Sequence, residues 1–421
     1  MKNCIFKSVI AALLAFAILL TAASCSSGTD SPEITDDETD TKIPPEEQTT
    51  IRFDPVIDPS TETETETETE EPYIETEFTG DASDSYLTID GIDQISNKNI
   101  IIFIIDRFDV NYFEQVDLLY PGFFDDLDGF TYFSDNVSLY SRTYPAVTTM
   151  ITGIDTDFSS SAESYFFDAY RNSPFLKDLK RNGYKIKIYT QNFYCYRDGT
   201  PFGGVADNLS YYTGDSNMYD LDDPAVCSLI LNNGLSLDGN EKSYILIHLS
   251  GCHSPYNMDE NANRASDPSM SQHLRGCMKM IYSYIDEMKR LGVYDDSTIV
   301  ITGDHPAALS DYDVPWQPRL TALFVKPSGS TGKLKFSSAE VSQENLIPTL
   351  VKSAEIKTSN EYGPSYFEIQ EGQHTVRHHK FQLCIDGNSV VQIVDLEVNG
   401  DGTDFSNWSV KSYADIGALY K

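Results

Sequence analysis

The chain has 421 residues, of which 40% are hydrophobic, enough for a sizeable core and for one large or two to three ordinary domains. Its 65 acidic residues outnumber 30 basic ones, and the formal net charge is −35. Nucleic-acid binding relies on basic surfaces that neutralise phosphates. The charge therefore excludes nucleic acid as an expected partner.

The first 25 residues read as a targeting segment. A short apolar run, residues 9–20, follows two lysines, and small residues lead into Cys25. The run is too short to predict a membrane span. This pattern resembles a bacterial lipoprotein signal. We therefore expect Cys25 to be lipidated and to anchor the protein to the outside of the cell membrane, with ordinary signal cleavage and release as the alternative.

The composition divides the rest of the chain into three segments. Residues 26–85 are rich in Thr, Glu, Asp and Pro, and self-repelling charge predicts a disordered acidic linker. Residues 86–370 have the apolar runs of a globular domain. Residues 371–421 contain an alternating stretch, 381–398, that predicts a small C-terminal β-hairpin.

Apolar runs alternate with helical patterns through the globular segment. Residues 99–105, 184–189, 244–249 and 297–302 predict strands, and the first of them is apolar throughout, as in strands buried on both faces of a parallel sheet. A long amphipathic pattern, residues 272–291, predicts a helix that faces the core. The alternation favours a three-layer α/β/α sandwich around a mostly parallel central sheet.

Polar side chains follow three of the predicted strands, where ligands of parallel sheets bind. Asp106 ends the first strand, His253 lies just beyond the third, and Asp304 and His305 follow the fourth. A carboxylate beside an imidazole offers the ligands that zinc or manganese sites require. Any one of these residues alone fits an ordinary turn or cap equally well.

Residues 141–153 read as a loop that enters a helix. Pro145 suits a first helical turn and Gly153 a helix end. Thr143 then lies near a helix N-terminus, where backbone N–H groups favour an anion. Thr143 is either a simple cap or a hydroxyl nucleophile that attacks a phosphorus or sulfur centre.

The ordered set of these motifs resembles the alkaline phosphatase/sulfatase superfamily, and within it the lipoteichoic acid synthase and phosphoethanolamine transferase branch. The resemblance rests on strand-end Asp106, on residues 142–153 (RTYPAVTTMITG), on residues 248–257 (HLSGCHSPYN) and on residues 301–305 (ITGDH). It implies that residues 86–370 form the catalytic domain.

The resemblance implies a role for each matched residue. Thr143 matches the nucleophile, which also contacts the metal, and Asp106, Asp304 and His305 match the other metal ligands. His253 matches the histidine that contacts substrate or leaving group. The implied reaction is attack on a phosphoester of the cell envelope, of phosphoglycerol or phosphoethanolamine type, with a phospho-threonine intermediate and one divalent ion, zinc or manganese. A second ion is left open, because Leu249 stands where a related branch has a metal-binding Asp.

Several alternatives stay open at this point. The protein could be a small-molecule phosphodiesterase similar to nucleotide pyrophosphatases, or a surface binding lipoprotein that retains the fold without catalysis. The absence of apolar spans after Cys25 favours a tethered hydrolase or accessory transferase over a polymerising synthase. His374, His378 and His379 are expected to be exposed, although one of them could complete the site.

Overall fold

The computed structural model describes residues 85–190, 205–211, 222–307, 320–385 and 389–416. All of them belong to one compact unit, Glu70–Lys421. The predicted signal segment with Cys25 lies outside the described residues, as does the predicted linker except for its last residue. Among the described residues, no helix is both long and apolar enough to cross a membrane.

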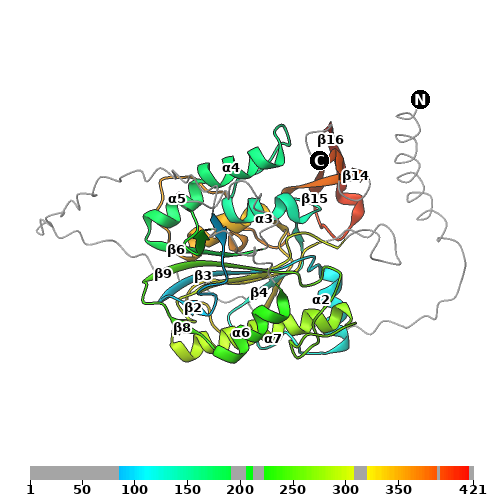
Figure 1. Ribbon diagram of the computed structural model, residues 1–421. Coiled ribbons are helices and arrows are strands. Elements are labelled where there is room, and N and C mark those ends of the chain that lie inside the picture. Colours follow the sequence, from blue (N-terminus) through cyan, green and yellow to red (C-terminus); the bar gives the residue numbers. More distant parts are fainter. Residues whose placement is uncertain (1–84, 191–204, 212–221, 308–319, 386–388, 417–421) are drawn as a thin grey trace, which may run out of the picture. The chain divides into compact units, whose positions relative to one another are not determined.

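A seven-stranded sheet forms the centre of this unit (Figure 1). All neighbouring strands are parallel except at β11, which is antiparallel to both of its neighbours. The strands, in order across the sheet, are β12 (Lys335–Ser337), β4 (Thr131–Phe133), β11 (Leu323–Lys326), β10 (Thr298–Thr302), β3 (Lys98–Ile105), β9 (Lys242–Leu249) and β6 (Tyr184–Tyr189).

Strand β3 shows why the sheet has a hydrophobic core on each face. Residues 100–105 are all apolar and fully buried. Successive side chains of a strand point to opposite faces. Accordingly, Ile101, Phe103 and Ile105 belong to one core cluster. Ile100, Ile102 and Ile104 belong to the other.

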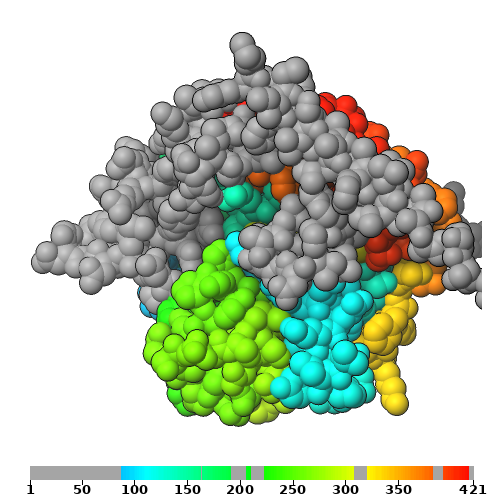
Figure 2. Space-filling view, turned by 90° about the vertical axis from the view of Figure 1, so that its right-hand side faces the viewer, coloured from blue at the N-terminus to red at the C-terminus, as the bar shows by residue number. Residues whose placement is uncertain are grey.

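Helices cover both faces of the sheet, which confirms the predicted three-layer α/β/α architecture. Figure 1 shows α2, α6 and α7 on one face and α3, α4 and α5 on the other, and α8 packs into the core of the latter face. Figure 2 shows α2, in cyan, beside the green α6 and α7. The helices are α2 (Val110–Leu119), α3 (Thr143–Thr152), α4 (Ala162–Asn172), α5 (Pro174–Arg181), α6 (Asp223–Asn233), α7 (Met270–Leu291) and α8 (Leu346–Ser353).

Helix α7 forms where the sequence predicts a long amphipathic helix. Ser269 and Gln272 form a reciprocal capping box at its start, and Gly292 ends it in the left-handed conformation with φ 74°. Its buried face includes Leu274, Met278 and Ile281. These side chains belong to the core under the sheet, so the stripe is structural.

A second sheet near the C-terminus has three antiparallel strands, one more than the predicted hairpin. The strands are β14 (Val376–Ile385), β15 (Ser389–Asn399) and β16 (Trp408–Asp415). The predicted hairpin turn, residues 386–388, lies outside the described residues. The β14 backbone bonds to the loop before α3, because Lys380 N donates to Leu139 O at 2.7 Å and Ser141 N donates to Lys380 O at 3.3 Å.

The remaining elements are short. In the described part of the chain, three pairs of strands form separate two-stranded sheets, and three 3-10 helices lie in the C-terminal half of the sequence. They are β1 (Ser85–Leu87) with β7 (Leu209–Tyr211), β2 (Gln94–Ile95) with β8 (Ser236–Leu237), β5 (Asn136–Val137) with β13 (Val341–Ser342), and η3 (Gln343–Asn345), η4 (Tyr366–Glu368) and η5 (Phe405–Asn407).

Candidate metal and nucleophile site

The register of three adjacent strands brings ligand-type side chains to one edge of the sheet. Ile104 of β3 pairs with Thr302 of β10 on one side and with His248 of β9 on the other. Asp106 and Asp304 each come two residues after this row. Because side chains two residues apart share a face, Asp106, Asp304 and His248 point to the same side of the sheet.

Helix α3 supplies the hydroxyl on this face. Its regular part begins at Pro145, because Tyr144 has extended backbone angles, and Gly153 ends it with φ 71°. Thr143 therefore stands at the entry of the helix, as the sequence predicts. Its Oγ1 lies 3.3 Å from Asp106 Oδ2 and 3.2 Å from His305 Nε2. The structure thus brings together Asp106, Thr143, Asp304 and His305.

His305 is held in the tautomer that a metal ligand requires. Its Nδ1 lies 2.7 Å from the carbonyl oxygen of Pro306, which can only accept, so Nδ1 carries the proton. The unprotonated Nε2 faces Asp106 Oδ1 at 3.7 Å and Asp304 Oδ2 at 3.6 Å. The imidazole lone pair and the two carboxylates repel one another unless a cation or a proton lies among them.

The carboxylates of Asp106 and Asp304 also favour a bound cation. Asp304 Oδ1 accepts from Arg107 N at 3.0 Å. Its Oδ2 and Asp106 Oδ1 are buried, and neither makes a hydrogen bond within the described part of the chain. Buried polar atoms are normally hydrogen-bonded. Carboxylate oxygens and an imidazole nitrogen converging in this way fit a divalent cation.

Burial shifts the ionisable groups toward their neutral forms. Burial, and then the charge of Asp304, raises the pKa of Asp106 well above its ordinary value. Burial also lowers the pKa of His248 and of His305 below the ordinary histidine value. A cation in the site would reverse this tendency for the carboxylate and would suit the two neutral imidazoles.

His248 belongs to this site, although the sequence analysis did not identify it. Its Nε2 lies 3.9 Å from Asp106 Oδ2, and its Nδ1 lies 3.0 Å from Thr190 Oγ1. Asp106, His248 and Asp304 form one of the described groups that could hold a metal ion. Within an apolar strand a histidine reads as a core residue, so only its position one residue before the end of β9 hinted at the site.

His253 is the remaining residue that the sequence predicts for the site. It is half-buried in the turn after β9, and its Nδ1 donates to Ser254 O at 2.5 Å. After burial and other charges, a charge on His253 contributes to lowering the pKa of both His248 and His305. His253 therefore lies within electrostatic reach of the two buried histidines of the site.

The expectation that the late histidines are exposed is confirmed only for His374, because His378 is half-buried and His379 is buried. His374 is 70% exposed in its side chain and pairs with Glu340, as a surface residue would. His379 is buried, and its Nδ1 donates to Ser138 O at 2.7 Å. The pairing of β14 with the loop before α3 buries His379 behind the site.

Comparisons with known proteins identify the family of this chain. The family model described as Sulfatase matches residues 98–356. The lipoteichoic acid synthase of Staphylococcus aureus is 25% identical over 223 residues, which cover 46% of this chain and 34% of the synthase. The chain thus spans about a third of the length of that relative.

A solved structure shows the same fold. The lipoteichoic acid synthase LtaP from Listeria monocytogenes superposes with a TM-score of 0.51 and 16% identity, covering 76% of this chain and 87% of that one. The chain therefore belongs to the sulfatase family, and within it resembles the lipoteichoic acid synthase branch.

Proposed function

We propose that the protein is a metal-dependent phosphodiesterase or phosphotransferase that acts outside the cytoplasm on phosphoesters of the cell envelope, with Thr143 as nucleophile. The observation that supports it most is the position of the Thr143 hydroxyl. It is half-buried, at a helix entry, within 3.3 Å of one buried carboxylate and one unprotonated imidazole nitrogen. A hydroxyl so placed is oriented for attack on a phosphorus centre.

The residues divide the work of an in-line displacement. Asp106 accepts the hydrogen bond of the Thr143 hydroxyl. As Thr143 passes this proton to Asp106, its Oγ forms the new bond to phosphorus and the bond to the leaving alcohol breaks. Protonated His253 gives its proton to the departing alkoxide. Water or an acceptor alcohol then attacks the phosphorus and gives a proton back to His253, while Thr143 Oγ leaves and regains its proton from Asp106.

Asp106, Thr143, Asp304 and His305 would hold the cation, with His248 beside them. A bound zinc or manganese ion lowers the pKa of the threonine hydroxyl and neutralises charge on the phosphoryl oxygens. Carboxylate and imidazole ligands suit both of these metals. Because His248 is a second histidine at the site, the proposal allows either one or two bound ions.

The test uses the full-length protein with zinc or manganese and bis-p-nitrophenyl phosphate, beside p-nitrophenyl sulfate. We expect metal-dependent release of p-nitrophenol from the phosphodiester, abolished in Thr143→Ala and partly kept in Thr143→Ser. Thr149→Ala is the matched control, because Thr149 lies in the same helix and hydrogen-bonds to Tyr165 instead. After incubation with the natural phosphoester substrate, mass spectrometry of the peptide that contains Thr143 should show a phosphoryl adduct.

Three other outcomes would change the proposal. Preference for the sulfate ester would make the protein a sulfatase. Bound metal without turnover would direct the search to lipid donors, starting with phosphatidylglycerol and phosphatidylethanolamine. A protein that neither binds metal nor cleaves any ester would be the non-catalytic binding lipoprotein considered above.

The proposed location rests on Cys25 and has its own test. Lipidation of Cys25 would tether the protein to the outer side of the cell membrane, within reach of lipid head groups and wall polymers. We expect Cys25→Ser to move the protein from the membrane fraction to the soluble fraction. Unchanged membrane association of the variant would remove the anchor from the proposal.

A further inference from the structure

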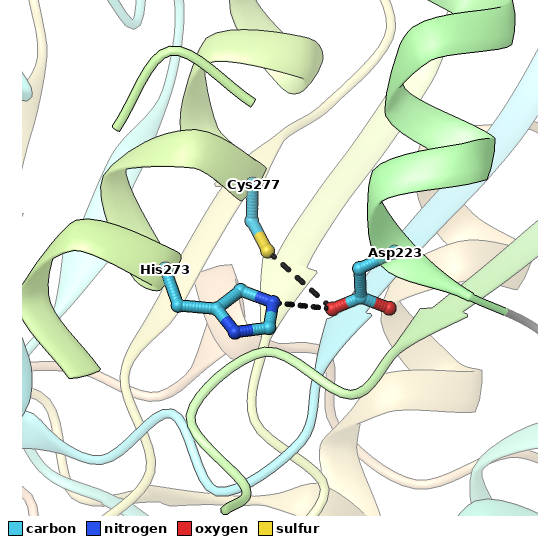
Figure 3. Close-up of side chains that lie close together, drawn as sticks. All are labelled: Asp223, His273 and Cys277. Atoms are coloured by element: carbon cyan, nitrogen blue, oxygen red, sulfur yellow. Dashed lines mark hydrogen bonds and ion pairs between the residues drawn. The ribbon is translucent and has the colours of Figure 1, made fainter. Parts of the chain in front are cut away.

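A second cluster of buried ionisable side chains lies on the opposite layer, under the turn that carries His253. It consists of Asp223, the first residue of α6, and of His273 and Cys277, one turn apart on α7 (Figure 3). All three are at most 1% exposed. The ligand-type atoms of these three side chains lie close enough together to hold a metal ion. Their hydrogen bonds show whether the cluster needs one.

The Asp223 carboxylate is surrounded by donors. Its Oδ1 accepts from Ser250 N at 2.9 Å, and its Oδ2 accepts from Gly251 N at 2.8 Å. His273 Nε2 lies 2.9 Å from Oδ2, and Cys277 Sγ lies 3.8 Å from the same oxygen (Figure 3). A carboxylate that accepts from two backbone amides and two side chains is satisfied without a cation.

His273 extends this contact to the far end of the same segment. Its Nδ1 accepts from Asn257 N at 3.4 Å, so the proton lies on Nε2 and points to Asp223. Asn257 Nδ2 also donates to Asp222, the N-cap of α6, at 3.2 Å. The segment 250–257 is therefore held at its start by Asp223 and at its end by His273 and Asp222.

The other side of this turn rests on the metal-ligand strand. Gly251 has φ +51°, and a Cβ there would come within 2.3 Å of Ile105 Cγ2 and 3.1 Å of Asp106 N. Cys252 N donates to Asp106 O at 2.9 Å. The turn is thus clamped between Asp223 and the backbone of Asp106, and His253 is the next residue along the chain.

We infer that Asp223 and His273 are positioning residues: the pair fixes the segment 250–257 and so sets where His253 stands relative to Thr143. This inference rests on the proposed function for its catalytic consequence. The two residues reach the reaction only through the backbone of the segment. Their removal should therefore affect the steps that depend on His253 and leave the metal ligands in place.

The first experiment measures position independently of activity. Hydrogen exchange of the full-length protein is compared for wild type, Asp223→Asn and Asp178→Asn. In Asp223→Asn an NH2 group replaces one of the two acceptor oxygens, so we expect at least one of the backbone amides of Ser250 and Gly251 to lose at least about 10-fold in protection. Retained protection at both amides would overturn the inference.

Asp178→Asn is a matched control at another place in the fold. Asp178 is also a fully buried acid, and it accepts from Asn360 at 2.9 Å and Tyr362 at 2.8 Å. Its variant should loosen residues 357–362 and leave 250–257 unchanged. His273→Gln keeps a donor for Asp223 but loses the acceptor for Asn257 N, so its exchange should rise at Asn257 only.

The second experiment tests the catalytic consequence with two leaving groups. Glycerophosphoethanolamine has an alkoxide leaving group that needs a proton, whereas bis-p-nitrophenyl phosphate does not. We expect Asp223→Asn to lower kcat about 100-fold on the first ester and less than about 10-fold on the second. When His253 is already replaced by Ala, adding Asp223→Asn should lower kcat less than about 3-fold on either ester.

The outcomes separate the inference from the proposed function. Equal losses on both esters that persist in the His253→Ala background would overturn the positioning role. A wild type inactive on every ester would overturn the proposed function, while hydrogen exchange would still decide whether the pair holds the segment. If Asp304→Asn still binds zinc and the double variant Asp304→Asn, Cys277→Ala does not, the cluster is a metal site and the inference is overturned.

Discussion

His305 and Thr143 face each other across the end of the sheet, with His305 Nε2 3.2 Å from Thr143 Oγ1. The imidazole holds its proton on Nδ1, against the carbonyl of Pro306. The nitrogen that faces the hydroxyl therefore offers a lone pair and no hydrogen. This arrangement suits a shared cation better than a catalytic dyad, because the two neighbouring carboxylates also point their oxygens inward.

Asp304→Asn tests the like-charge repulsion that a cation would offset. Burial, and then the charge of Asp304, raise the pKa of Asp106, so the folded metal-free protein holds this carboxylate less favourably at neutral pH than the unfolded chain does. In EDTA we expect the variant to melt about 2–4 °C higher than wild type. With zinc or manganese the order should reverse, because wild type gains binding energy that the variant lacks. Calorimetry under both conditions measures this, and a variant less stable in EDTA would contradict it.

His248→Leu tests whether the unpredicted histidine takes part in metal binding. Its Nε2 is 3.9 Å from Asp106 Oδ2, close enough to coordinate directly or to orient the ligands. We expect metal affinity to fall about 10- to 100-fold in titration calorimetry. His374→Leu serves as control, since that imidazole is largely exposed on the surface. Equal affinities for the two variants would exclude His248 from the site.

The sequence alone predicted the parts of the site that follow a strand or open a helix. Asp106, Asp304 and His305 come directly after continuous apolar runs, and parallel strands bring such ends to one edge. Thr143 follows from the proline and glycine that bound its helix. Each of these signals is local, within about ten residues of the side chain concerned.

The residues that the sequence did not reveal depend on pairing between distant segments. His248 lies inside a strand, and its place near Asp106 follows only from the register of β3 with β9. Asp223 and His273 are 50 residues apart, and meet because α6 packs beside α7. His379 is buried because β14 pairs with the loop before α3. No local pattern encodes such contacts.

We expect His379→Asn to reduce the loss of folding stability at acidic pH. Burial lowers the pKa of His379 from 6.5 to about 4. The unfolded chain therefore binds more protons than the folded one between these values, and stability falls as pH drops through this window. Wild type should lose about 3 kcal/mol more than the variant between pH 7 and pH 4. Urea unfolding at several pH values measures the difference, and parallel curves would refute the assignment.

Arg377→Met should destabilise the protein strongly, because it removes one partner of a buried ion pair. Arg377 is 2% exposed and holds both carboxylate oxygens of Asp135, with Nη1–Oδ1 at 2.5 Å and Nη2–Oδ2 at 3.2 Å. It thereby joins β14 to the segment after β4. Loss of the guanidinium leaves Asp135 charged and buried, at a cost of about 3–5 kcal/mol.

The pH dependence of this deficit follows from Asp135. Burial already raises the pKa of Asp135 even with Arg377 present, and without Arg377 it should rise further. The folded variant then binds a proton more readily than the unfolded chain, so its deficit should shrink as pH falls. Lys411→Met is the control, since its pair with Glu397 is on the surface and should contribute little. Two results would attribute the loss of stability in Arg377→Met to lost packing instead of the buried charge. One is a loss that stays constant with pH. The other is a loss that is no smaller when Asp135→Leu is added.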